Sequence, residues 1–377
     1  MTNANQRALE LHTKYKGKIS TSLRDQPDSL EKLSAYYSPG VAAVSRLIAD
    51  HPEKLREVTW VNNLVAVISD GSAVLGLGNV GPKAAMPVME GKAMLFKHFA
   101  DIDAVPIVLD VHTADDIVAA VTAIAPSFGA INLEDIAAPL CFEIEQRLKS
   151  TLDIPVFHDD QHGTATVVLA GLINALKVTG RSLDDCRIVL IGAGAAGVAI
   201  AKLLKLYGNP TIVAFDSKGA LHSKRTDLNT TKQLLASYAS ENRYDHLEAA
   251  MGGADIFIGV SAPDILSEAH IRSMARDPII FALANPDPEI TPEKAHAAGA
   301  AIVATGRSDY PNQVNNAVAF PGIFRGALDN NVSTITDEHK ILAAKAIAGL
   351  ITNPQADSII PSVMEPRLVP AIAEVIR

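Results

Sequence analysis

Four acidic side chains stand in two adjacent pairs, and each pair follows a short stretch typical of a β-strand. Glu134 and Asp135 come after the first stretch, and Asp159 and Asp160 come after the second. Four carboxylates that converge on one place repel each other unless a cation lies between them, and oxygen ligands of this kind suit Mg²⁺ or Mn²⁺. On spacing alone two interpretations stay open, a divalent metal site and a pair of solvated loops.

Two histidines in the second of these segments offer a competing metal site. His158 and His162 share a face if the segment is helical, and they could then bind zinc. Neither a third histidine nor a cysteine stands nearby in the sequence. The oxygen-rich site is therefore the preferred hypothesis.

A glycine-rich turn is the second candidate site. Residues 192–197 read Gly-Ala-Gly-Ala-Ala-Gly between a strand predicted over 187–191 and a helix predicted over 195–207. Gly192 permits the tight turn, Gly194 lets a pyrophosphate approach the backbone, and Gly197 lets helix and strand pack closely. The helix N-terminus adds N–H groups and a favourable dipole. The predicted dinucleotide loop comprises Gly192, Ala193, Gly194, Ala195, Ala196 and Gly197.

The end of the next predicted strand, over 211–215, bears on the choice of dinucleotide. Asp216 stands about 20 residues beyond the glycines, where an acid accepts hydrogen bonds from the adenine ribose. A carboxylate repels the additional phosphate of NADP, but Lys218, which follows Ser217, could offset that repulsion. We expect a modest preference for NAD, with NADP possible.

A second Gly-x-Gly-x-x-Gly match, at residues 76–81, lacks this context. A hairpin is predicted before it, from a strand over 64–69, an Asp70-Gly71 turn and a strand over 73–77. Pro82 follows the glycines, and Pro87 is expected to break any helix there. A tight backbone turn beside the active site is the expected use of these glycines.

Strand and helix patterns alternate along the chain, and their order predicts an α/β fold. Short strands over 104–109, from 131 and over 155–157 mix with helices such as 114–124. Beyond a helix over 165–179, strands over 187–191, 211–215, 255–260, 279–283 and 301–304 favour a parallel, doubly wound sheet. We predict an N-terminal α/β domain over residues 1–160 and a Rossmann-type dinucleotide-binding domain over residues 161–377, with a ligand cleft between them.

The composition is that of an ordinary globular protein, with 48% hydrophobic and 20% charged residues among 377. The formal net charge of −9 argues against a nucleic-acid partner. Neither a signal peptide nor a membrane span is expected, because apolar runs are too short. The two cysteines, Cys141 and Cys186, fit a reducing compartment. We expect a cytoplasmic protein.

The motifs, taken in chain order, resemble those of the malic enzyme family in its short bacterial form. The resemblance covers nearly the whole chain, and it is specific only as a set. Its elements are Tyr37-Ser-Pro-Gly-Val41, Gly76-Leu-Gly-Asn79 with Pro87-Val-Met-Glu-Gly-Lys92, Asn132-Leu-Glu-Asp135, Phe157-His-Asp-Asp-Gln-His-Gly-Thr164, Phe281-Ala-Leu-Ala-Asn-Pro286 and Asn312-Gln-Val-Asn-Asn316.

The resemblance implies oxidative decarboxylation of L-malate to pyruvate and CO₂ with NAD(P)⁺, a divalent metal and a homodimer, and oxaloacetate as a further substrate. Lys92 would be the general base, assisted by Asp159, and Tyr37 the general acid. The implied metal ligands are Glu134, Asp135 and Asp160. Asn285 and Asn316 would hold the substrate carboxylates, with Asn285 also near the cofactor.

One departure leaves a carboxylate partner open. Larger members of the family carry an arginine before the Gly-Leu-Gly turn, where this chain has Ala73. We expect no counterpart of the acyltransferase-like extension that longer bacterial relatives carry. A malolactic enzyme, a plain 2-hydroxyacid or amino-acid dehydrogenase and a dinucleotide-sensing regulator without turnover remain alternatives.

Overall fold

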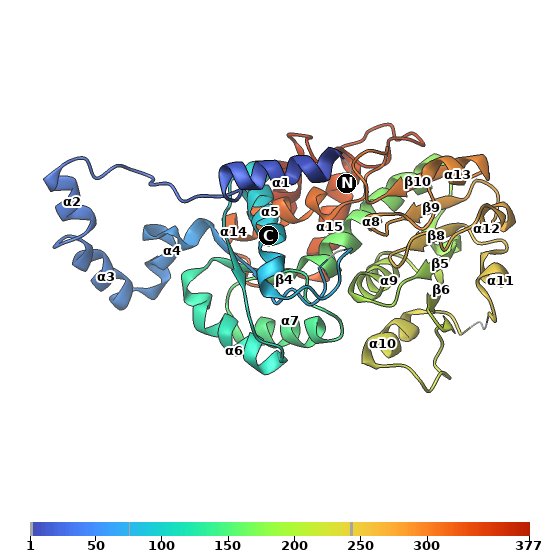
Figure 1. The fold of residues 1–377 in the computed structure, drawn as a ribbon, viewed down its shortest axis with the longest axis horizontal. Coiled ribbons are helices and arrows are strands. Elements are labelled where there is room, and N and C mark those ends of the chain that lie inside the picture. Colours follow the sequence, from blue (N-terminus) through green and yellow to red (C-terminus); the bar gives the residue numbers. More distant parts are fainter. Residues whose placement is uncertain (1–2, 75, 242–243) are drawn as a thin grey trace.

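The computed structural model describes residues 3–74, 76–241 and 244–377, and it contains two sheets (Figure 1). The first sheet is parallel, with the strand order β2-β1-β3-β4. Because the carboxyl ends of parallel strands meet at one edge, residues that follow β3 and β4 become neighbours. The strands are β1 (Leu64–Ser69), β2 (Asp103–Val108), β3 (Ala130–Leu133) and β4 (Val156–His158).

Helices cover both faces of this first sheet. Alternate residues of β1 point to opposite sides, so Val65 and Val67 join one core while Ala66 and Ile68 join another. The first side is covered by α5 (Pro82–Ala100) and α14 (Phe320–Asp329), and the second by α6 (Ala114–Ile124) and α7 (Leu140–Thr151).

The second sheet is doubly wound, as the alternation of strands and helices predicts. Its order is β10-β9-β8-β5-β6-β7, and all neighbours are parallel except the β6–β7 pair. Its strands are β5 (Arg187–Ile191), β6 (Thr211–Asp216), β7 (Gly219–Ala220), β8 (Ile256–Gly259), β9 (Ile279–Ala282) and β10 (Ile302–Thr305). One face carries α8 (Asp159–Thr179), α9 (Ala195–Tyr207) and α10 (Thr230–Tyr238), and the other α11 (Leu247–Met251), α12 (Glu268–Ser273) and α13 (Pro292–Ala297).

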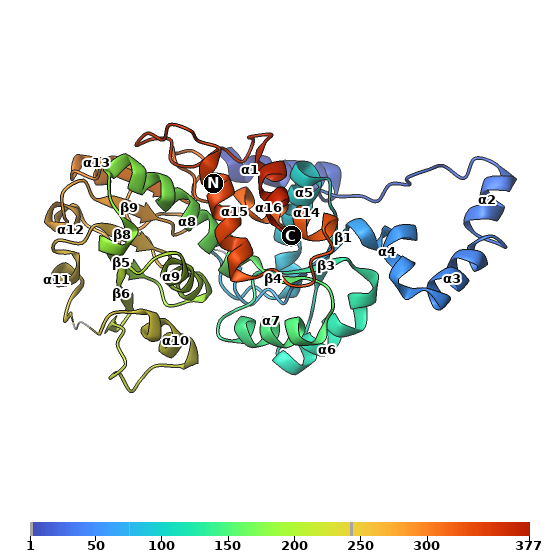
Figure 2. The same ribbon diagram turned by 180° about the vertical axis from the view of Figure 1, so that it is seen from behind.

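One hydrophobic core runs from the first sheet into the second. Val65 and Phe157 of the first sheet belong to the same buried cluster as Ile188 and Phe281 of the second. Helix α8 begins at the end of β4 and passes into this cluster, where α15 (Asp337–Gly349) and α16 (Leu368–Val375) also pack (Figure 2). The chain thus returns from the second sheet to close over the first.

The predicted hairpin after β1 is wrong. Both edges of β1 are already paired in parallel, with β2 and β3, so a following antiparallel strand has no edge to join. The predicted second strand, 73–77, is a loop with an isolated bridge between Val74 and Gly78, and its residue Leu75 lies outside the described residues.

The expectation that Pro87 would break a helix is also wrong. Helix α5 begins at Pro82, continues through Pro87 and ends at Ala100. A proline inside a helix costs about 3 kcal/mol. Burial of Met89, Ala93 and Phe96 on the following turns offsets that cost at about 1.5–3 kcal/mol for each large side chain.

The N-terminal segments lie outside both sheets. Helix α1 (Asn3–Tyr15) runs across the body, whereas α2 (Leu30–Tyr36) and α3 (Val41–Asp50) extend away from it, at the left of Figure 1. The short helix α4 (Leu55–Val58) leads back to β1. The 3₁₀ turns are η1 (Pro52–Lys54), η2 (Trp60–Asn63), η3 (Ala125–Ser127), η4 (Leu183–Asp185) and η5 (Asn316–Val318). Among the described residues, no helix is both long and apolar enough to cross a membrane.

Candidate active site

A buried lysine lies at the centre of the candidate site. Lys92 projects from the covered face of α5 and is 7% exposed. Its Nζ lies 2.5 Å from an Asp159 carboxylate oxygen and 2.8 Å from one of Glu134. The ring of Phe320 lies on another side, with its centroid 4.1 Å from the amine. An amine held on three sides in this way is fixed in position.

Two carboxylates set the protonation state of this amine. Burial works to lower the pKa of Lys92, but Asp159 and Glu134 together outweigh it and raise that pKa above its ordinary value. Burial in turn raises the pKa of Asp159 to about 6, against the pull of Lys92. These two carboxylates therefore favour the charged ammonium.

The four predicted carboxylates converge at the carboxyl edge of the first sheet. Glu134 and Asp135 follow β3, and Asp159 and Asp160 form the first turn of α8 directly after β4. The backbone N–H of Asp135 donates to Asp160 Oδ2 at 2.8 Å. Burial raises the pKa of Glu134, and the nearby Asp160 carboxylate adds to the rise. The two acidic pairs therefore lie at one edge of the first sheet.

The carboxylate cluster fits a hard divalent cation in its chemistry. Asp159 Oδ1 is buried without a hydrogen-bond partner among the described residues, and Lys92 is the cation that pairs with both Asp159 and Glu134. Such an excess of buried negative charge is costly unless it is paired. The site is not preassembled, because no three His, Cys, Asp or Glu side chains in the described ranges are arranged to hold a metal ion as they stand.

A glycine in the first turns of α8 makes room for Asp159. A Cβ atom added at Gly163 would lie 1.8 Å from Asp159 Oδ1 and 3.0 Å from the Cβ of Asn316. Any side chain at this position would therefore displace the carboxylate that pairs with Lys92. The same close approach brings Asn316, at the start of η5, beside the site. Sequence reasoning missed Gly163, although its spacing of four residues from Asp159 on a helix was a usable signal.

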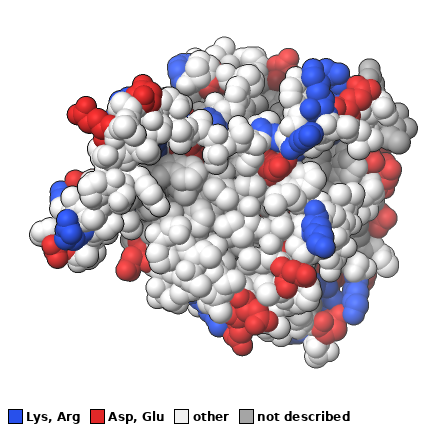
Figure 3. Space-filling model, turned by 60° about the vertical axis from the view of Figure 1, so that its left-hand side comes forward, with Lys and Arg blue, Asp and Glu red and all other residues white. Residues whose placement is uncertain are grey.

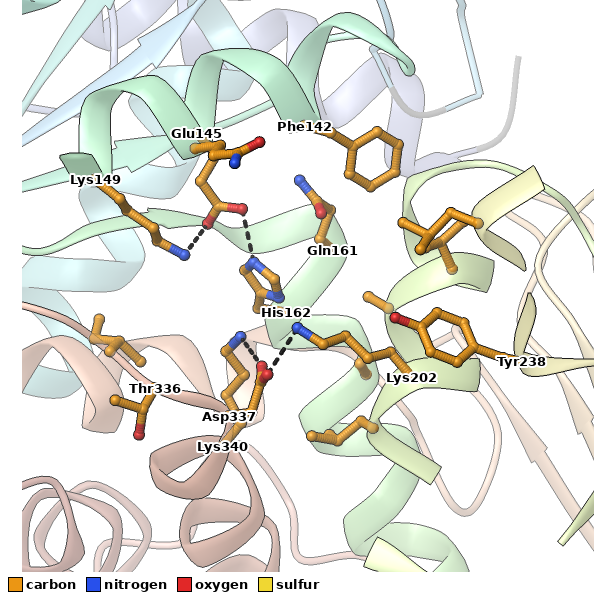
Figure 4. A pocket seen from close by; sticks show the side chains of 17 residues that line it. Phe142, Glu145, Lys149, Gln161, His162, Lys202, Tyr238, Thr336, Asp337 and Lys340 are labelled. Carbon is orange, nitrogen blue, oxygen red and sulfur yellow. Dashed lines mark hydrogen bonds and ion pairs between the residues drawn. The ribbon is translucent and has the colours of Figure 1, made fainter. Parts of the chain in front are cut away.

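The opposite side of the same turn faces a cavity of about 600 Å³ (Figure 4). His162 points into it and lies 2.9 Å from Glu145 Oε2, and burial lowers the pKa of His162 to about 4. Glu145 also accepts the backbone N–H of His158 and pairs with Lys149. His162 is thus engaged with Glu145, a buried acid on α7 that sequence reasoning missed. Its spacing of four residues from Lys149 was the only sequence signal.

Each glycine of the glycine-rich loop stands where the backbone conformation or the available space suits its predicted role. Gly192 has φ of +122°, and a Cβ there would lie 2.6 Å from the carbonyl oxygen of Val260. A Cβ at Gly197 would lie 1.9 Å from the Gly192 carbonyl oxygen. At Gly194 nothing stands within 4 Å, which leaves open space at the N-terminus of α9. Residues 193–196 form the start of this helix, and an anion can approach its N–H groups without obstruction.

The acid at the end of β6 is already held by cations. Asp216 accepts from Arg225 at 2.8 Å, from Lys232 at 2.6 Å and from the backbone N–H of Lys218. Although burial opposes it, Arg225 and Lys232 hold the pKa of Asp216 at about 2. The side-chain amine of Lys218 instead pairs with Asp227. The amine that lies on Asp216 is thus that of Lys232 rather than Lys218, and among the described residues no hydrogen bond joins Ser217 to Asp216.

The structure brings Asn285 to the boundary between the two sheets. Asn285 follows β9, and its carbonyl oxygen would lie 3.4 Å from a Cβ added at Gly76 of the other glycine-rich loop. That loop is the tight turn expected beside the site. Its neighbour Ala73 donates its backbone N–H to the Asp135 carbonyl at 2.9 Å. Ala73, the position of the expected departure from the family, therefore lies beside Asp135.

Tyr37 is the predicted site residue that the structure does not bring to the others. It caps the C-terminus of α2 on the extended N-terminal segment and is 73% exposed. The remaining predicted residues lie at the carboxyl edge of the first sheet or at the facing edge of the second.

Comparisons with known proteins cover almost the whole chain. A family described as "Malic enzyme, N-terminal domain" matches residues 16–149, and "Malic enzyme, NAD binding domain" matches residues 161–375. The bifunctional malic/malolactic enzyme of Bacillus subtilis strain 168 is 52% identical over 98% of this chain and 91% of the relative. The NADP-dependent malic enzyme of Rhizobium meliloti strain 1021 is 49% identical over 97% of this chain and 51% of that longer relative. The crystal structure of an NAD-dependent malic enzyme from Thermotoga maritima superposes with a TM-score of 0.95, 50% identity and 98% coverage of each chain.

Proposed function

The chain belongs to the malic enzyme family, and we propose that it oxidises L-malate and decarboxylates the product to pyruvate and CO₂, with reduction of NAD(P)⁺ and help from Mg²⁺ or Mn²⁺. The observation that carries this proposal is the buried amine of Lys92 between Asp159 and Glu134. Residues 1–160 would carry the base and the metal ligands, and residues 161–377 the dinucleotide. Oxaloacetate is a further substrate of the same site.

The proposed mechanism begins with the proton that leaves the malate C2 hydroxyl. Lys92 takes the proton of the malate C2 hydroxyl, with Asp159 holding the amine in place. A bound dinucleotide would supply the hydride acceptor for C2, and a divalent cation held by the carboxylates would supply positive charge near the C2 oxygen. After CO₂ leaves, C3 must gain a proton. Tyr37 is the proposed donor because of the family resemblance, and it would have to reach the Lys92 site from the extended N-terminal segment.

Three carboxylates are the proposed metal ligands, namely Glu134, Asp135 and Asp160. The support is their convergence after β3 and β4 and their oxygen chemistry, which suits Mg²⁺ or Mn²⁺. Binding of a cation there would compete with Lys92 for Glu134. That competition would lower the pKa of the amine towards the value a base needs. Asn285 and Asn316 are the proposed partners of the substrate carboxylates.

A cytoplasmic homodimer is the proposed state of the enzyme. Cys141 and Cys186 are both buried free thiols, which suits a reducing compartment. Product analysis tests the reaction: the purified chain is given L-malate, each dinucleotide and each metal. Pyruvate and reduced dinucleotide should form in equal amounts. Lactate without reduced dinucleotide would favour the malolactic alternative, for which the Bacillus relative's name is the specific reason. Oxaloacetate alone, or no turnover, would contradict the proposal.

Replacing Arg225 with alanine should shift cofactor preference further towards NAD. We expect NAD to be modestly preferred by the unaltered chain, because Asp216 favours ribose hydroxyls over a phosphate. Arg225 lies on Asp216, as Lys232 does, and its guanidinium is the proposed partner for the phosphate of NADP. A lost charge-assisted hydrogen bond costs about 1.5–3 kcal/mol, so kcat/KM for NADP should fall by roughly 10- to 100-fold. The measurement is kcat/KM with each dinucleotide.

The matched control for this variant is Lys218→Ala. The Lys218 amine faces Asp227 rather than Asp216, so its loss should leave the ratio of the two kcat/KM values nearly unchanged. An equal shift in both variants, or a shift only in Lys218→Ala, would return the discriminating role to Lys218.

A further inference from the structure

The cavity on the far side of α8 from Lys92 has the size of a small-molecule site (Figure 4). Residues of five helices line it, α7, α8, α9, α10 and α15. Its volume of about 600 Å³ falls within the range of ~300–1,000 Å³ typical of such sites. The described residues of its lining include neither Lys92, nor the four carboxylates, nor residues 192–197, nor Asp216. The cavity is therefore separate from the proposed substrate and dinucleotide sites.

Positive charge exceeds negative charge in this cavity, called here the lysine cavity after Lys149, Lys202 and Lys340 in its lining. The acids among the described lining residues are Glu145 and Asp337. Glu145 pairs with Lys149 at 2.7 Å. Asp337 pairs with Lys202 at 2.7 Å and with Lys340 at 2.8 Å. Because each ammonium has three N–H groups, donors remain for a ligand, and one further negative charge would balance the lining.

A buried amide in the lining lacks a hydrogen-bond partner. Gln161 is 3% exposed, and its Nε2 donates to no described residue. Figure 4 shows this side chain between Glu145 and Phe142 on the lining of the cavity. Buried polar groups in proteins are nearly always hydrogen-bonded, so an unsatisfied donor indicates that an acceptor completes the site. The amide and the lysines together suit an oxygen that carries negative charge.

Much of the remaining lining is apolar. Phe142 of α7, Leu203 of α9, and Leu234 and Tyr238 of α10 contribute ring and alkyl surface. An inorganic anion would leave this surface uncovered, and a doubly charged anion would exceed the single positive charge that is in surplus. The ligand that fits is therefore an organic monocarboxylate with an apolar body.

The broad face shown in Figure 3 offers an anion a different setting. That face has few charges and is bordered by Lys, Arg, Asp and Glu. An anion on it would meet few cations and would stay in contact with water. In the lysine cavity, by contrast, Lys340 is 4% exposed and Glu145 is 6% exposed. Charges in such a poorly hydrated space interact more strongly than charges at the surface.

The lysine cavity and the Lys92 site share the first turns of α8. Asp159 pairs with Lys92 on one side of the helix, whereas His162 lines the cavity on the other. Glu145, which contacts His162, also accepts the backbone N–H of His158, the residue before Asp159. A carboxylate that competes with Glu145 for its lysine partner on α7 would therefore weaken the support of this turn.

We propose that the lysine cavity binds an organic monocarboxylate with an apolar body, and that the bound anion slows turnover at the Lys92 site. The carboxylate contacts Lys149, Lys340 and the amide of Gln161, while the apolar body packs against α7 and α10. Competition for Lys149 withdraws a partner from Glu145, so the first turn of α8 loses part of its support. The binding step is independent of the proposed function, whereas the effect on turnover rests on it.

Calorimetry with 3-phenylpropanoate on the full chain tests the binding step. One molecule should bind per chain, and the uncharged 3-phenylpropanamide should bind at least about 10-fold more weakly. Lys340→Met removes a buried donor and should weaken binding by roughly 10- to 100-fold. Leu234→Glu keeps every ion pair and adds a negative charge at an exposed position of the lining, so binding should weaken by about 10-fold.

The matched control is Leu206→Glu, which makes the same change on α9 at an exposed position outside the lining. It should bind the probe as the wild type does. Both glutamate variants should keep the basal rate of malate oxidation. In the wild type, 3-phenylpropanoate should lower kcat for malate even when malate is saturating. Leu234→Glu should need about 10-fold more probe for the same inhibition, and Leu206→Glu should need no more than the wild type.

Four results would overturn the proposal. Inhibition that excess malate removes and that Leu234→Glu leaves unchanged would place the probe in the substrate site. Equal binding of the amide, or tighter binding of phenyl phosphate, would exclude a monocarboxylate site. Equal loss of binding in Leu206→Glu would exclude this cavity, and binding without any change in rate would exclude coupling through α8. A wild-type chain that binds the probe as expected but does not oxidise malate would contradict the proposed function and leave the binding site standing.

Discussion

Replacing Lys92 with alanine should slow malate oxidation by about 10²- to 10⁴-fold, the usual contribution of a positioned acid or base. The amine is buried and is held by Asp159 and Glu134. A water molecule in the vacated space would lack the tether to α5 that fixes the position of the amine. The measurement is the steady-state rate of dinucleotide reduction with malate and Mn²⁺. Small amines added to the Lys92→Ala variant should restore part of the rate, because they can occupy the vacated space and accept the proton.

The control for this variant lies on the same helix. Lys97 projects from the far end of α5 and pairs with exposed Asp101, so Lys97→Ala removes the same side chain without touching the site. It should keep its activity. Oxaloacetate supplied directly bypasses hydride transfer, and its decarboxylation by Lys92→Ala separates loss of the base from collapse of the site. Normal malate oxidation by Lys92→Ala would remove this lysine from the mechanism.

Replacing Asp135 with asparagine should abolish turnover that depends on Mn²⁺ or Mg²⁺, with a loss of at least about 100-fold. The change removes one negative charge from a buried group of carboxylates and leaves the size of the side chain unaltered. Dinucleotide binding should survive, since residues 192–197 lie in the other sheet. The measurements are Mn²⁺ affinity, dinucleotide affinity and the metal dependence of the rate.

An exposed acid supplies the comparison for Asp135→Asn. Glu143 on α7 pairs with Arg147 at the surface, and Glu143→Gln makes the same change of charge outside the carboxylate cluster. Its Mn²⁺ affinity should equal that of the wild type. If Asp135→Asn keeps both its Mn²⁺ affinity and its usual metal dependence, the metal ligands must be sought elsewhere.

The second sheet was predictable because its signals are local. Strands β5 and β6 and helix α9 have the predicted starts, and each glycine of the loop has a steric reason within a few residues of it. Convergence of the acidic pairs was also predictable, because residues after neighbouring parallel strands share one edge.

The failures share a different cause, namely contacts between segments far apart in sequence. A strand followed by Asp-Gly looks like a hairpin until the partners of β1 are known. Pro87 breaks a helix only where burial does not outweigh the lost hydrogen bond. The role of Glu145 depends on its contact with His162, and that of Gly163 on its closeness to Asp159. Neither contact can be read from the sequence. The sequence motif around Tyr37 indicated its chemistry, but no local pattern says which edge of a sheet it will reach.

The continuous core of the two sheets has a consequence for how the protein unfolds. Helix α8 starts beside Lys92 and ends inside the cluster that holds Ile188 and Phe281, so neither sheet can lose its packing alone. Heating should therefore melt both lobes in one cooperative transition, despite the two separate sheets. A fragment ending near residue 160 would leave Phe157 and Val65 without the side chains that cover them. The two sheets are separate in architecture but unfold together, and neither sheet with its helices is expected to fold as an isolated fragment.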